Sequence, residues 1–214
     1  MAATAEIDRP RGRGRVTWVF RGGAGGNARL TALTGAILIV LLAAEGATIP
    51  FIGKQLTLHM ALGVALIPAV LLKLGATGWR FVRYYVRDRE YVRRGPPHPL
   101  MRLLVAPLTV ASTLVLFGTG VLIIVMHPQR GFVIGLHKAS FIVWFGAMAV
   151  HVLGHVLELP EHLHVDRERE LPGARLRSFL LATALVAGAV VAVAALPSIH
   201  HWVDWAAAHH RHDG

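Results

Sequence analysis

Three histidines interrupt an apolar stretch that is long enough to cross a membrane, GLHKASFIVWFGAMAVHVLGH at residues 135–155. They are His137, His151 and His155, and a further histidine, His59, lies in a second apolar stretch. Ionisable groups inside a bilayer are costly, usually face the interior of a helix bundle and mark functional sites by default. These histidines are therefore the first candidates for chemistry in this chain.

Five apolar segments must position these side chains, and each is close to the roughly 20 residues that a helix needs to cross a membrane. Of the 214 residues, 54% are apolar and 16% are charged, a composition that indicates a membrane protein. We predict an all-α, polytopic membrane protein with five transmembrane helices. The predicted spans cover residues 30–50, 56–76, 103–126, 133–158 and 178–197.

The arginines gather in alternate loops and predict the orientation. They precede the first span and follow the second and fourth spans, whereas the opposite side holds only Lys54, Arg130, Lys138 and Arg211. The positive-inside rule places the amino terminus in the cytoplasm and the carboxyl terminus outside. We expect the cell (inner) membrane of a bacterium, and the net charge of +10 indicates orientation signals and not nucleic-acid binding.

The topology gives each histidine a depth. Spans two and four both enter from the outside, and His59 and His137 each lie about one turn in. Lys73 and His151 come fourteen residues further along, which is roughly 21 Å deeper on nearly the same helix face. His155 returns to that face roughly 27 Å below His137.

Two imidazoles at one level on facing helices suit the two axial positions of a b-type haem. The chain has no cysteine, which excludes covalent haem attachment and thiolate-held clusters. Gly63 follows His59 by four residues and is a candidate position for haem clearance. We expect the first four spans to form an up-down four-helix haem-binding bundle with a peripheral fifth helix. Glu45, near the outer end of span one, is interpreted as an interfacial carboxylate, with quinone binding or proton uptake as alternatives.

The pattern His59-x-x-x-Gly63 on one span, with His137 and His151 on another, resembles a known family. It is similar to the four-helix cytochrome b subunits that anchor bacterial respiratory oxidoreductases, such as the formate dehydrogenase, hydrogenase and thiosulfate reductase types. The resemblance covers residues 30–158. It implies a bis-histidine haem, exchange of electrons with a quinone or quinol pool, and a redox enzyme subunit as partner.

A two-haem member of that family would carry a second histidine near position 73, where this chain has Lys73. One haem is therefore predicted between His59 and His137. A second haem, with His151 or His155 and an unusual ligand such as Lys73 or His98, stays open as an alternative. Lys73 is interpreted as a partner of a haem propionate or as a lysine whose amine extends to the inner interface.

A divalent-metal transporter or sensor is the competing interpretation. His151 and His155 are four residues apart on one helix face, a spacing used in zinc sites, and Glu158, Glu161, His162 and His164 follow. The carboxyl-terminal tail adds five more histidines: His200, His201, His209, His210 and His212. Against this, no span carries a carboxylate at mid-depth to form an ion path.

The chain divides by composition into five parts: a basic amino-terminal segment (1–29), a cytochrome b-like region (30–158), a loop (159–177), a fifth helix (178–197) and a histidine-rich tail (198–214). The fifth helix has small and β-branched residues that suit close packing, so a purely structural anchor is a third alternative. GGAGG at residues 22–26 lacks the context of a phosphate loop and is interpreted as a linker. The basic aromatic stretch at 79–97 is interpreted as a solvated loop, with contact to anionic lipids as the functional alternative.

Overall fold

The computed structural model describes residues 22–93, 100–126, 131–156 and 173–209. Every regular element in these ranges is a helix, which confirms the predicted all-α class. The elements are α1 (Gly23–Thr48), the 3₁₀ turn η1 (Ile49–Phe51), α2 (Ile52–Tyr85), the short α3 (Arg89–Val92), the π-helical turn η2 (Met101–Val105), α4 (Ala106–Met126), α5 (Gly131–Val156) and α7 (Ala174–His209).

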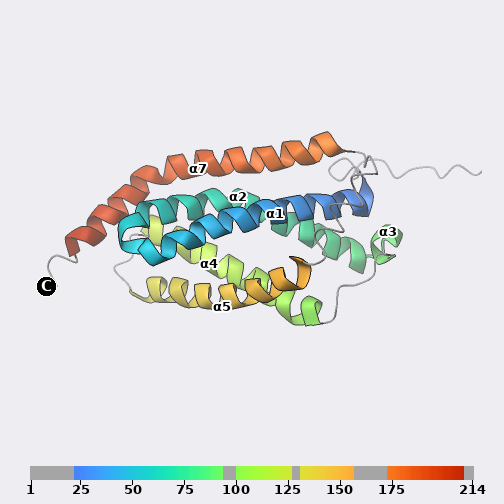
Figure 1. Cartoon of the computed structure of the whole chain (residues 1–214), viewed down its shortest axis with the longest axis horizontal. Coiled ribbons are helices and arrows are strands. Elements are labelled where there is room, and N and C mark those ends of the chain that lie inside the picture. Colours follow the sequence, from blue (N-terminus) through green and yellow to red (C-terminus); the bar gives the residue numbers. More distant parts are fainter. Residues whose placement is uncertain (1–21, 94–99, 127–130, 157–172, 210–214) are drawn as a thin grey trace, which may run out of the picture.

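Four helical stretches are long and apolar enough to cross a membrane: 23–85, 101–126, 131–154 and 174–208. The first stretch holds two helices, because the chain turns back at η1 and α2 then packs against α1 (Figure 1). Non-helical backbone at Phe51 and Gln55 marks this turn. The predicted multi-pass membrane character therefore agrees with the helices that the structure describes.

The helices form two groups that meet through α4 (Figure 1). In one group, α2 packs against both α1 and α7, and in the other, α4 packs against α5. Successive long helices run in opposite directions, so the order is up, down, up, down, up (Figure 1). In the described ranges, α2 and α5 do not pack backbone against backbone, although α4 contacts both.

Apolar clusters join the two groups. Met60 and Val64 of α2 pack with Ile123 of α4 and with Ile199 and Trp202 of α7. A second cluster contains Leu38 of α1 and Leu66, Ala69 and Val70 of α2, with Phe117 of α4 packed against it. Since α7 contributes buried residues to the first cluster, it is an integral part of the packing around α2.

Several helices extend beyond their predicted limits. α2 continues to Tyr85, nine residues past the predicted span, and α7 continues through Pro197 to His209, so residues 198–209 of the predicted tail are helical. The prediction that residues 22–26 form a linker is wrong, because Gly23–Gly26 begin α1. Ala24, Gly25 and Gly26 are buried there, where side chains of larger size would hold the start of α1 away from its neighbours.

Gly188 allows α7 to approach α2. A Cβ atom at Gly188 would collide with the backbone carbonyl oxygen of Ala65, an atom that cannot move out of the way without displacing the helix. Gly75 on α2, in contrast, faces open space, and a Cβ atom added there would meet no neighbouring element of the described structure within 4 Å. The glycine at 188 is therefore explained by close helix packing, as small residues commonly are in membrane proteins.

We expect Gly188→Ala to destabilise the detergent-solubilised protein by about 1–3 kcal/mol, the usual cost of overpacking. The matched control Gly75→Ala should leave stability unchanged or raise it by up to about 1 kcal/mol, because alanine favours helix over glycine. Thermal unfolding followed by circular dichroism measures both. Equal melting temperatures for wild type and Gly188→Ala would contradict the described packing of α7 on α2.

Candidate functional site

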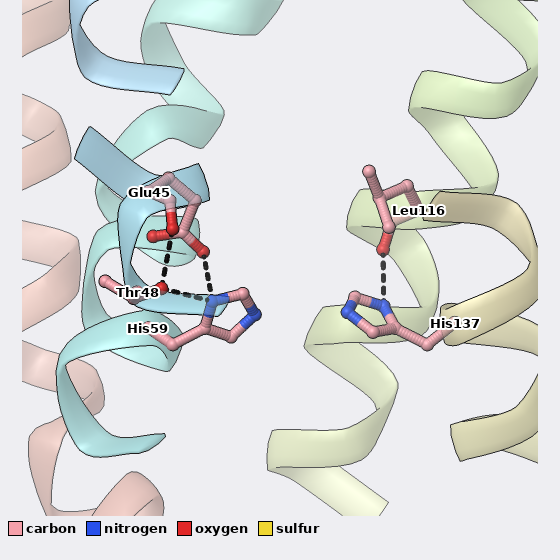
Figure 2. Close-up of polar contacts among 5 residues, drawn as sticks. All are labelled: Glu45, Thr48, His59, Leu116 and His137. Carbon is pink, nitrogen blue, oxygen red and sulfur yellow. Dashed lines mark hydrogen bonds and ion pairs between the residues drawn. The ribbon is translucent and has the colours of Figure 1, made fainter. Parts of the chain in front are cut away.

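His59 lies on the second turn of α2, and its imidazole contacts the end of α1. His59 Nδ1 is 3.0 Å from Oε1 of Glu45 and 2.8 Å from Oγ1 of Thr48 (Figure 2). The side chains of His59 and Glu45 are 22% and 14% exposed, so the contact is largely shielded. The turn η1 brings these residues together, since it folds α2 back beside the last turn of α1.

The hydrogen bonds determine which nitrogen of His59 carries the proton. Thr48 Oγ1 donates its only proton to the backbone carbonyl of Glu45, at 2.6 Å. Toward His59 the hydroxyl therefore acts as an acceptor, as does the Glu45 carboxylate, and Nδ1 must be the donor. In the neutral ring the lone pair is then on Nε2.

His137 on α5 is held in the same way by α4. Its Nδ1 lies 3.1 Å from the backbone carbonyl of Leu116 (Figure 2). It also lies 3.1 Å from Oγ1 of Thr119. The Thr119 hydroxyl donates to its own helix, at 2.7 Å from the carbonyl of Val115, and so accepts from the imidazole. A carbonyl can only accept, and Nδ1 of His137 is therefore the donor as well.

The two imidazoles face one another (Figure 2). Each ring directs Nδ1 toward its own helix pair and Nε2 toward the other ring, His59 from the α1–α2 side and His137 from the α4–α5 side. Two nitrogen lone pairs cannot hydrogen-bond to each other. The arrangement instead offers two ligand atoms to a metal centre, or two acceptors to a proton donor, placed between them.

Gly120 leaves space beside the ring of His137, whereas Gly63 lies beside the carboxylate of Glu45. A Cβ atom at Gly120 of α4 would lie 3.4 Å from Cε1 of His137, closer than most real Cβ contacts. A Cβ atom at Gly63 would lie 3.5 Å from Oε1 of Glu45, which is ordinary contact. Gly63 thus sits beside the carboxylate that holds His59, one turn further along α2.

Trp144 fixes α5 against α4 two turns from His137. Its indole Nε1 donates to Oγ1 of Thr113 at 3.0 Å, and both side chains are buried. Thr113 in turn donates to the carbonyl of Thr109 at 2.6 Å. Trp144 therefore has a defined packing role on the α4 side of α5.

Lys73 is directed toward α1. Its Nζ donates to the backbone carbonyl of Thr31 at 2.6 Å, and a Cβ atom at Gly35 would lie 2.8 Å from that amine. Gly35 therefore leaves the space through which the lysine reaches the backbone of α1. From the sequence, we predict that this amine contacts a haem propionate or the inner membrane interface. In the structure, the amine donates to the neighbouring helix α1.

His151 is half-buried on α5, and its side chain is not without a partner. The side chain of His155 lies outside the described residues, as do Glu158, Glu161, His162, His164 and the tail from 210 onward. Among the described side chains, no group of three or more histidines or carboxylates could hold a metal ion. His200 and His201 lie on α7, and His200 is exposed.

Sequence reasoning misses the partners of the two histidines. It assigns Glu45 to the membrane interface, whereas the structure places this carboxylate against His59. It assigns no role to Thr48 or Thr119. The partner Thr119 could be predicted from the sequence, because it lies in the third predicted span at about the depth of His137 in the fourth.

No family model, curated protein or solved structure matches this chain. The candidate site is therefore interpreted from its own geometry.

We expect the purified, detergent-solubilised chain, before any cofactor is added, to contain His59 and His137 in the tautomer with the proton on Nδ1. Nitrogen-15 NMR of histidine-labelled protein distinguishes protonated from bare ring nitrogens, and the spectra of His59→Ala and His137→Ala assign the two residues. The opposite tautomer at either position would show that the hydrogen bonds to Glu45 or Leu116 are wrongly described.

Proposed function

We propose that this chain is a five-span membrane protein that binds b-type haem between His59 and His137 and relays electrons between a quinone or quinol pool and a redox partner protein. One observation carries the proposal. The two imidazoles come from different helix pairs, each has its Nδ1–H bonded to a protein acceptor, and each directs Nε2 toward the other (Figure 2).

The hydrogen bonds at Nδ1 support ligation of a metal centre. Metal-bound histidines almost always donate their second ring N–H to a carboxylate, a backbone carbonyl or water, which fixes the ring and raises the basicity of the ligand. His59 has a carboxylate in this role and His137 has a backbone carbonyl.

A haem fits the two ligands better than a bare divalent ion. Zinc sites need three or four protein ligands, and the described side chains provide no such group at His59 or His137. A haem takes four ligands from its own macrocycle and needs only two from the protein. The backbones of α2 and α5 do not approach one another within the described ranges, which suits a flat group between the two helix pairs.

A bound haem would supply one-electron chemistry, and His59 and His137 would be the residues that hold it. The chain's own residues hold the rings: Glu45 and Thr48 orient His59, and Leu116 and Thr119 orient His137. The carboxylate places negative charge beside one ligand only, which favours the oxidised state at that site.

One haem is better supported than two. Lys73, the residue at the level of a second site, donates its amine to the carbonyl of Thr31 and faces α1. To ligate iron it would have to leave that carbonyl, and losing a hydrogen bond costs free energy in an apolar environment. His151 is more simply assigned to polar contacts between helices.

The five spans follow from counting α1 and α2 separately, at 26 and 34 residues. With five crossings the termini would lie on opposite sides, and the arginine-rich loops favour an amino terminus in the cytoplasm. We propose the inner membrane of a bacterium as the location. His59 and His137 then lie toward the outer face. The quinol would approach from the lipid, and the redox partner from either side of the membrane.

We expect the purified protein from haem-replete cells to show sharp b-type bands in the reduced-minus-oxidised spectrum, with a pyridine haemochrome ratio of one haem per chain. His59→Ala and His137→Ala should each lose the low-spin bands, since one axial ligand is removed, whereas His200→Ala, an exposed histidine on α7, should retain them. Haem content that is unchanged in both ligand variants would contradict ligation at this site.

His151→Ala separates one haem from two, because it should leave the ratio at one. A ratio of two in wild type that falls to one in His151→Ala would replace the single-haem proposal. A colourless wild-type protein would contradict haem binding altogether.

Orientation can be measured directly because the chain contains no cysteine. Single cysteines introduced as Ala3→Cys and Gly214→Cys should differ in intact bacterial cells: a membrane-impermeant maleimide should label the carboxyl-terminal position and leave the amino-terminal position unlabelled until the cells are opened. Labelling of both, or of neither, would contradict an odd number of spans.

A further inference from the structure

A basic cavity lies where α2 ends and α3 begins. Its volume is about 500 Å³, and it is lined by two tyrosines, three arginines and a valine: Tyr84, Tyr85, Arg87, Arg89, Val92 and Arg93. Among the residues that the structure describes, no carboxylate contributes to this lining. The cavity is at the far end of the bundle from the turn η1, and so at the opposite end from His59 (Figure 1).

The two carboxylates of this segment are occupied elsewhere. Asp88 accepts from Arg83 through one oxygen and from the backbone N–H of Glu90, at 3.0 Å, through the other. The carboxylate of Glu90 lies against Gly23 at the start of α1. Within the described ranges, Arg87, Arg89 and Arg93 are therefore not neutralised by an ion pair.

Arg83 holds α3 against α2, so the cavity has a fixed wall. Besides its ion pair with Asp88, its guanidinium lies 5.6 Å from the centre of the Trp79 ring and 5.9 Å from the centre of the Tyr91 ring. Tyr91 is buried beneath it. The three arginines of the cavity are thus carried by a packed corner of the fold.

The surroundings of the cavity are apolar as well as basic. Phe81, Val82, Tyr85 and Val86 on the last turns of α2 are each more than half exposed. Such side chains beside arginines suit the boundary between acyl chains and headgroups, where tyrosine and arginine are both favoured. A soluble acidic protein would neutralise the arginines and leave these apolar side chains in water.

We propose that this cavity, lined by Arg87, Arg89 and Arg93, binds the phosphate of an anionic phospholipid headgroup. Guanidinium groups donate paired hydrogen bonds to phosphate oxygens, and the tyrosine rings and Val92 provide apolar surface for the glycerol region. The inference rests on the membrane placement proposed above and not on haem binding.

The test uses the full-length, detergent-purified protein and native mass spectrometry, with phosphatidylglycerol and phosphatidylcholine as probes. Phosphatidylglycerol should bind more tightly to wild type than phosphatidylcholine. Replacing all three arginines (R87Q, R89Q and R93Q) should weaken phosphatidylglycerol binding by roughly fivefold per arginine, and so on the order of a hundredfold. The single variant R93Q should weaken it about fivefold, which keeps the test valid if the triple variant unfolds.

The matched control removes three arginines from the 159–177 region and the start of α7: R167Q, R169Q and R175Q. This control changes the net charge by the same amount as the cavity triple variant. It should leave the affinity for phosphatidylglycerol nearly unchanged. If both triple variants weaken phosphatidylglycerol binding equally, the lipid is attracted diffusely to basic loops and the proposed site is wrong. Unaltered phosphatidylglycerol affinity in the cavity variants would also contradict the proposed site. A different result would be that the cavity binds inorganic phosphate through its arginines and shows no preference between the two lipids. That result would contradict a lipid headgroup as the ligand and would favour a soluble phosphate.

Haem content serves as an independent measurement in the same samples. The cavity variants should keep the haem ratio of wild type, so a failure of the lipid proposal and a failure of the haem proposal give different results.

Discussion

The structure depends on satisfying polar groups between apolar helices without water. In such an environment a hydroxyl that has donated its proton to its own helix can only accept from other groups. Thr48 and Thr119 are both in this state, since each donates to a backbone carbonyl of its own helix. They therefore force the adjacent imidazoles to donate through Nδ1, and the orientation of both Nε2 lone pairs follows from two threonine side chains.

The two imidazoles have different electrostatic surroundings. His59 donates to a carboxylate, whereas His137 donates to a backbone carbonyl, which is a neutral dipole. A carboxylate beside an imidazole raises electron density on that ring. Each half of the site is also complete within one helix pair, because the imidazole and its acceptor come from adjacent helices. Packing of α1–α2 against α4–α5 then suffices to assemble the site.

Much of the architecture could be predicted from the sequence. The helical class follows from the apolar segments, and the common level of His59 and His137 follows from their similar distance to the ends of their spans. The contact between Glu45 and His59 could not be predicted, because it depends on the three-residue turn η1 and on where α2 starts. The sequence also underestimates the length of α7, since a proline at 197 and several histidines resemble a loop boundary, yet neighbouring residues Ile199 and Trp202 are buried against α2.

The depth of Lys73 in the membrane can be predicted from the sequence, but the direction of its side chain cannot. Hydropathy gives the distance of a residue along a helix, whereas the direction of its side chain depends on which neighbour leaves space. Gly35 leaves that space on α1, and this glycine carries no signal of its own among the many small residues of the spans. Side chains that reach a backbone carbonyl are especially difficult to predict, because every residue offers such a carbonyl.

The antiparallel register within each helix pair links the ends of the bundle to the candidate site. In α1–α2, the contacts Asn27–Ala76, Lys73–Thr31 and Glu45–His59 join residues whose numbers add to 103, 104 and 104. Between η2–α4 and α5, the residue numbers of Met101–Gly154, Thr113–Trp144 and Thr119–His137 add to 255, 257 and 256.

The totals within a pair differ by no more than two, so the contacts distant from the histidines share nearly the same register as those at the histidines. Asn27 and Lys73 thus help to place Glu45 beside His59, although they lie several turns away. Their role in the fold is to hold α1 in register with α2, and that register is what brings a carboxylate to the imidazole.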